Sequence, residues 1–279
     1  MKIIIFRILV TLFLVHVISC TSYANNFDDA CTSELSLTEQ NKKLWAVNLT
    51  GIGIVTAWGV ANWDYFSTSA KTTSEGWFKN DTKSGGADKL GHLYSSYVTT
   101  RGLSYLYKSW CINKNDAALY GALSSLAIVT YIEIGDSFSD HGFSKEDIIA
   151  NTIGVIFGYA TYKSPKLSNI VDLRWEYKPN SNGSDFVTDY ENSKFLLALK
   201  LNAFNFAQDN FLKHIEFHAG YYTRGFSDPD VSKERNIFIG LGINFTDLLG
   251  RHSYNKTSTL LKYYQIPGSS FQSRKDFNK

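Results

Sequence analysis

The spacing of apolar residues changes once along this chain of 279 residues, and this change constrains the fold more than any other feature. From Leu44 to about Tyr162 the apolar residues recur with a helical period, whereas after about Val171 they alternate as in strands. Helices followed by strands predict an α+β fold. We therefore expect a bundle of about four helices over residues 44–165 and a small antiparallel β-rich region over residues 166–279.

The first expected helix, residues 44–63, contains no charged residue over about the length that a bilayer requires. Tryptophans lie near both of its ends, but Asn48, Thr50 and Asn62 interrupt its apolar character. Two interpretations stay open: a buried or membrane-contacting core helix, and a true membrane span. The other helices are expected from about Asp88 to Tyr107, from about Asp116 to Glu133 and from Asp147 to about Tyr162, after a polar loop at residues 67–86.

Three segments of the second part alternate as strands do: residues 195–204, 214–222 and 237–245. Three or four such strands are too few for a membrane barrel, so we expect a sheet with one apolar face against the helices or an oligomeric partner. His214, Glu216 and His218 share a face of the second strand. Their donor set suits zinc, but alternate polar residues also form a solvated face, which we expect here.

The chain begins like an exported protein, with Lys2 and Arg7 before an apolar stretch. Cleavage before Cys20, within 17-VISC-20, would make Cys20 the lipidated first residue of a bacterial lipoprotein. Cleavage after Ala24 by ordinary signal peptidase is the rival interpretation. Residues 1–24 are therefore expected to be a signal segment, and residues 25–43 a polar N-terminal segment.

Cysteine content and charge limit the partners. Without Cys20, the chain retains Cys31 and Cys111, which suit a disulfide in an exported protein, although two unpaired thiols remain an alternative. The net charge is only +2 and no basic tract occurs, which excludes nucleic acid as an expected partner. We expect contact with a membrane, through a lipid anchor or an apolar surface, and a further candidate partner is another envelope protein.

Six polar residues of the helical part are expected to meet. Asp88 and His92 are four residues apart and share a helix face, whereas Lys89 is expected to point to solvent. In an antiparallel bundle, the start of one helix lies beside the end of its neighbour. We therefore expect one pocket at one end, formed by the candidate site residues Asp88, His92, Glu133, Asp136, Asp147 and Asn151.

Each of these residues also has a structural interpretation. Asp88 follows two glycines and suits helix capping, and Asp147 lies three residues after Ser144 in a capping-box arrangement. His92 and Asn151 suit buried hydrogen bonds. Polar groups near apolar helix faces need to satisfy one another, so a connected network is expected, with either a structural or a catalytic role.

The motifs Trp63-Asp64, Trp77-Phe78, 86-GADKLGH-92 and 132-IEIGDSFSDHGFSKEDIIANTIG-154 resemble a family of predicted periplasmic lipoproteins of undetermined function. This resemblance covers about residues 55–165, and more loosely the later strands with 262-KYYQIP-267. The order Asp-Lys-x-x-His, acid, Ser-x-x-Asp, Asn-x-x-Gly is also similar to that of VanZ-like membrane proteins. The resemblance implies an exported, envelope-associated helical unit that carries the polar residues.

The leading hypothesis is an uncharacterised periplasm-facing lipoprotein of the outer membrane, organised by a buried Asp/His/Glu/Asn network. Thr21 after Cys20 resembles the arrangement found in lipoproteins that reach that membrane. The first alternative is an envelope enzyme acting on a lipid or glycan. In it His92 is the base or a metal ligand, Asp88 orients His92, Glu133 and Asp136 hold a metal or shuttle protons, and Asn151 stabilises charge. The second alternative is an integral membrane protein. The cofactor or metal, if any, stays unknown.

Overall fold

A computed structural model describes residues 31, 35–179, 187–251 and 255–278. The residues before Cys31, including the export segment and Cys20, lie outside this part of the chain. The described residues form N-terminal helices followed by an antiparallel sheet of five strands, which confirms the predicted fold class. The helices are α2 (Leu37–Asn62), α3 (Ala87–Ser109), α4 (Lys114–Ser137), α5 (Lys145–Lys163), α6 (Pro165–Ile170), α7 (Asn205–Gln208), α8 (Phe245–Arg251) and α9 (Asn255–Leu261).

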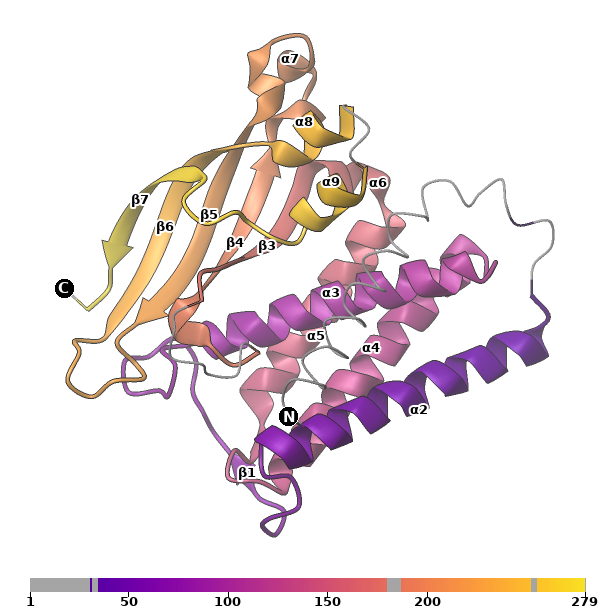
Figure 1. Cartoon of the computed structure of the whole chain (residues 1–279), viewed down its shortest axis with the longest axis vertical. Coiled ribbons are helices and arrows are strands. Elements are labelled where there is room, and N and C mark those ends of the chain that lie inside the picture. Colours follow the sequence, from indigo (N-terminus) through magenta and orange to yellow (C-terminus); the bar gives the residue numbers. More distant parts are fainter. Residues whose placement is uncertain (1–30, 32–34, 180–186, 252–254, 279) are drawn as a thin grey trace.

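Of the four long helices, α3 and α4 lie at the centre, and α2 and α5 pack against them. Helix α3 contacts α4 and α5, and α2 contacts α4. The approach of α3 to α5 is close, because a Cβ atom at Gly154 would lie 2.1 Å from the backbone oxygen of Leu93. In Figure 1 the sheet lies above α3, and α2 lies at the opposite side of the molecule.

Two expected helix boundaries were wrong. Helix α2 begins at Leu37, so its first turns lie inside the segment expected to be polar and outside the bundle. Ser36 caps it by accepting a hydrogen bond from the Glu39 amide at 3.3 Å, a local interaction that replaces the missing apolar pattern. Helix α4 continues to Ser137, so both Glu133 and Asp136 are helical. Pro165 follows the end of α5 as expected, and it opens the short helix α6.

The sheet has the strand order β3-β4-β5-β6-β7, and every neighbouring pair is antiparallel. Its strands are β3 (Val171–Tyr177), β4 (Ser193–Lys200), β5 (Ile215–Arg224), β6 (Glu234–Ile243) and β7 (Ser270–Asp276). A second, two-stranded parallel sheet pairs β1 (Thr72–Thr73) with β2 (Phe143–Ser144) and ties the loop after α2 to the start of α5.

The apolar face of the five-stranded sheet is covered only in part. Leu173 packs with Tyr97 of α3, and the rings of Trp175 and Phe195 lie 6.2 and 5.9 Å from Tyr94 of the same helix. The same face is exposed farther along the sheet, at Leu197, Phe217, Ile237, Ile239, Leu241, Ile243 and Phe271. Helices therefore cover this face, as predicted, only at β3 and part of β4.

The opposite face of the sheet is buried, contrary to the prediction of a solvated strand face. Glu216 and His218 are 0% and 2% exposed, and His214 precedes β5 rather than belonging to it. The strongly curved sheet buries this face against itself: Lys194 of β4 donates a 3.1 Å hydrogen bond to Gln272 of β7, three strands away. A flat sheet would hold those strands roughly 14 Å apart.

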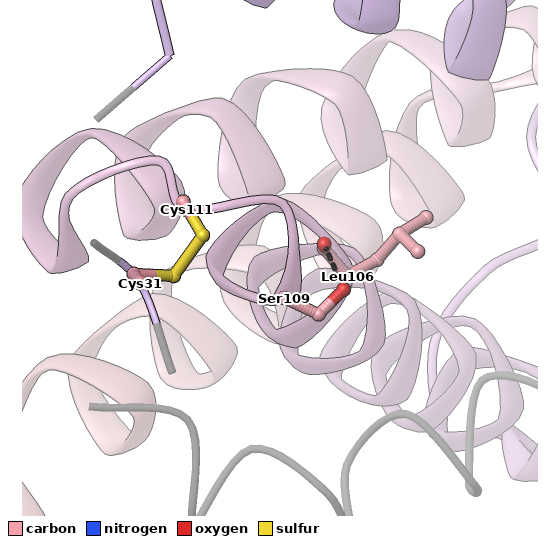
Figure 2. The surroundings of a disulfide bond; sticks show 4 residues. All are labelled: Cys31, Leu106, Ser109 and Cys111. Atoms are coloured by element: carbon pink, nitrogen blue, oxygen red, sulfur yellow. Dashed lines mark hydrogen bonds between the residues drawn. A yellow bond between two sulfur atoms is a disulfide. The ribbon is translucent and has the colours of Figure 1, made fainter. Parts of the chain in front are cut away.

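A disulfide joins Cys31 to Cys111 just after the end of α3, as Figure 2 shows. The bond closes a sequence separation of 80 residues. It therefore holds the chain that precedes α2 at the end of the helices where α3 ends and α4 begins.

Within the described part of the chain, two helices, α2 and α4, are long and apolar enough to cross a membrane by length and composition. Helix α2 is the less covered of the two, since Trp45, Leu49 and Val60 are all more than half exposed. A helix that is apolar on every side normally requires cover from protein or lipid. Helix α2 thus offers an apolar contact surface.

Candidate functional site

A tight turn at Gly85-Gly86 places the start of α3. Both glycines have positive φ, and a Cβ atom at Gly86 would lie 2.9 Å from the backbone of Phe78. A larger residue is therefore disfavoured there. The turn brings the first residues of α3 beside the end of α4 and the start of α5, as the packing of these three helices requires.

A cavity of about 500 Å³ opens at this end of the helices. Residues of α3, α4 and α5 line it together with residues from the loops before α3 and after β3. The titratable residues that line it are Glu75, Lys83, Asp88, His92, Asp136, His141, Asp147, Asp189, Tyr190 and Glu191. Glu133 and Asn151 are 1% exposed and lie behind His92, within the wall.

Lys89 lies at the centre of three carboxylates. Its ammonium forms ion pairs of 2.7 Å with Asp88 and with Asp147 and also contacts Glu75. Burial lowers the pKa of Lys89, but the adjacent charges of Asp88 and Asp147 outweigh that effect and raise it overall. The prediction that Lys89 points to solvent was therefore wrong: it is 2% exposed, because a long side chain at a helix start can turn back toward neighbouring acids.

His92 connects two buried carboxylates. Its Nδ1 atom lies 3.4 Å from Glu133, and its Nε2 atom lies 3.7 Å from Asp147. Asn151 donates a 3.1 Å hydrogen bond to Glu133 and accepts one of 2.8 Å from Ser96. A continuous polar chain thus runs from Ser96 in α3 to the ion pairs of Lys89. Asp88 pairs with Lys89. The carboxylates that contact His92, and can orient it, are therefore those of Glu133 and Asp147 rather than that of Asp88.

Burial raises the pKa of Glu133 to about 9, and the nearby negative charges of Asp147 and Asp136 add to this effect. Glu133 is therefore protonated at neutral pH. Burial also raises the pKa of Asp136, to about 7, although a hydrogen bond from Tyr65 opposes the rise. The cavity wall consequently holds more carboxyl groups than it can keep ionised.

The structure brings all six predicted site residues to one end of the helices. One half of the expected capping box forms, since the Asp147 amide donates to Ser144 at 3.3 Å, whereas the Asp147 carboxylate contacts Lys89. Sequence reasoning missed Glu75 and Ser96. Ser96 lies four residues after His92, so the helical period indicates a shared face, but the loop residue Glu75 has no comparable pattern.

One comparison with known proteins gives a match, and it covers this site. No curated protein and no solved structure matches the chain. The similarity to VanZ-like proteins noted above is not shown. Residues 74–163 match the family model described as "Predicted periplasmic lipoprotein (DUF2279)", and this range contains the candidate site residues from Glu75 to Asn151. Over this part of the chain, the protein is similar to a family of uncharacterised predicted periplasmic lipoproteins.

Proposed function

We propose that this protein is a lipid-anchored envelope lipoprotein that faces the periplasm, and that the acid-lined cavity is its working site. The family match and the lipoprotein-like sequence at Cys20 support the anchor. The observation that carries the cavity proposal is the position of His92, which lies between Glu133 and Asp147 and also lines an open cavity. A network with a purely structural role would not need such an opening.

The anchor is tested by metabolic labelling with a clickable fatty acid. The wild-type chain is expected to take up the label, and Cys20→Ala is expected to take up none. Label retained by Cys20→Ala would contradict the anchor. Separation of inner and outer membranes then tests the outer-membrane location that Thr21 favours.

The chemistry best suited to the cavity is a hydrolytic or group-transfer reaction on an envelope lipid or glycan. An imidazole held by carboxylates is an effective general base when a ligand can reach it. His92 is about one fifth exposed, whereas Glu133 and Asn151 are buried and can fix its surroundings. Lys89 balances part of the negative charge that a reacting group would meet.

This proposal is tested by comparing stability with function. A strain that lacks the protein is complemented with wild type, His92→Ala or His141→Ala, and its resistance to envelope-directed detergents and antibiotics is measured. We expect His92→Ala to fold normally and to lose complementation, whereas His141→Ala, which alters a neighbouring histidine of the same cavity, retains it. Loss of thermal stability in step with complementation would favour a structural network instead.

The exposed apolar side of α2 favours one alternative, an integral membrane protein with α2 as its span. Carbonate extraction of the Cys20→Ala chain separates the two possibilities. A lipid-anchored protein is expected to become soluble, whereas a spanning protein would stay in the membrane pellet.

A further inference from the structure

The geometry points to a divalent-cation site formed by His92, Glu133 and Asp147 in the wall of the cavity. This inference rests on the proposed role of the cavity and names a ligand for it. Each of the three residues offers one donor atom, and these atoms all lie within 4.8 Å of one another. The three donors come from α3, α4 and α5, so the tertiary packing creates the site.

The distances suit a compact cation. A tetrahedral site with bonds of about 2.1 Å places neighbouring donor atoms roughly 3.4 Å apart. The two contacts of the His92 ring measure 3.4 and 3.7 Å, longer than well-formed hydrogen bonds. Opposite ring nitrogens make these contacts, so a cation bound through one nitrogen requires the ring or one of the carboxylates to turn.

Neighbouring groups hold two of the donors in place. Asn151 donates to the Oε1 atom of Glu133, and Ser96 in turn donates to Asn151. Lys89 holds Asp147 at 2.7 Å. Outer groups of this kind orient metal ligands and are needed for high affinity. His92 lines the cavity, where water or a substrate group can complete the coordination.

The balance of charge also favours a cation. A second acid-rich group, Glu75, Asp88 and Asp147, has the same spacing, but the Lys89 ammonium contacts all three of its carboxylates, whereas in the first group it contacts Asp147 alone. Glu133 and Asp136 add two further carboxyl groups to this end of the helices. A cation beside His92 would balance the charge of the Glu133 carboxylate, as the Lys89 ammonium balances the charge of Asp88. One imidazole with two carboxylates suits Zn²⁺ or Mn²⁺ better than Mg²⁺, which prefers oxygen ligands and water.

Calorimetric titration of the chelator-treated full chain in detergent with ZnCl₂ and MnCl₂ tests the site, with MgCl₂ as comparison. We expect one equivalent of Zn²⁺ or Mn²⁺ to bind. His92→Ala and Glu133→Gln should each weaken this binding at least tenfold, and His141→Ala should leave it unchanged. Glu133→Gln is the sharper variant, because an amide keeps nearly the shape of the carboxyl but cannot supply an anionic ligand to a cation. Thermal melts report whether each variant is folded.

Absence of saturable Zn²⁺ and Mn²⁺ binding would overturn the site, as would equal weakening by His141→Ala. If folded Glu133→Gln binds like wild type, the assignment of Glu133 is also overturned. Failure here is distinguishable from failure of the proposed function. A cation that binds as expected while His92→Ala still complements would contradict the working role of the cavity and leave the site standing. Loss of complementation without cation binding would do the reverse.

Discussion

The molecule buries two charged clusters that differ in balance and access. In the sheet, Arg174 pairs bidentately with Glu216 at 2.5 and 2.9 Å, and Lys200 pairs with Asp172 at 2.8 Å. This cluster has two acids, two basic residues and His218, and all five residues are at most 3% exposed. In the helical part, five carboxyl groups surround Lys89 and His92, and the cluster opens onto a cavity.

The difference separates a structural network from a candidate site. A buried ion pair persists when its opposite charges balance each other internally, as those of Arg174 and Glu216 do. An excess of one charge beside an opening is satisfied instead by protons, water or a ligand. The raised pKa of Glu133, about 9, shows that protons take part of that role in the helical cluster.

The largest expected effect comes from a matched pair of substitutions at two buried glutamates, Glu216→Gln and Glu133→Gln. Glu216→Gln leaves excess positive charge in the closed sheet cluster and should lower the free energy of unfolding by about 3–5 kcal/mol. Glu133→Gln replaces a protonated carboxyl and should change it by less than about 1 kcal/mol. Urea unfolding of both variants at pH 7 measures the difference. Equal losses would mean that the two clusters have the same structural role.

The next effect is a dependence of stability on pH in the chelator-treated protein. Glu133 and Asp136 have pKa values of about 9 and 7 in the folded chain, against ordinary values of 4.5 and 3.8. Between its ordinary and its folded-state pKa, each group is protonated in the folded chain and ionised in the unfolded chain. Stability should therefore fall as the pH rises from about 5 to 9.

The sheet should behave in the opposite way. Burial alone would raise the pKa of Asp172, but Lys200 and Arg174 lower it overall, so its stabilisation is lost as the pH falls below about 4. Thermal melts across pH 3–9 are expected to show a loss of stability below about pH 4 and a second loss from about pH 5 to 9. Glu133→Gln should reduce only the second loss. If the second loss is unchanged in that variant, Glu133 is not its source.

The smallest expected effect concerns Asn151, which orients Glu133 without lining the cavity. Asn151→Ala should weaken Zn²⁺ or Mn²⁺ binding by about tenfold, since the loss of an outer hydrogen bond leaves all three ligands in place. Ser104→Ala is a suitable control, because the Ser104 hydroxyl donates to the Thr100 backbone oxygen of the same helix. Equal affinities of the two variants would contradict the orienting role of Asn151.

Much of the architecture follows from local pattern. The change from helical to alternating spacing predicts the fold class, because each period dictates which side chains share a face. The helical period also places Asp88 with His92, and antiparallel packing brings them to Glu133 and Asp147. The start of α2 was missed because its first turns are polar and depend on the Ser36 cap.

Only the tertiary structure decided where the long and the polar side chains lie. Lys89 turns inward because three carboxylates from separate segments meet there, and Glu75 reaches them from a loop that has no period. The sheet's curvature buries Glu216 and His218, since it brings β4 within reach of β7. Sequence periodicity determines which residues share a face, whereas the packing of distant segments determines whether that face meets solvent, another charge or a cavity.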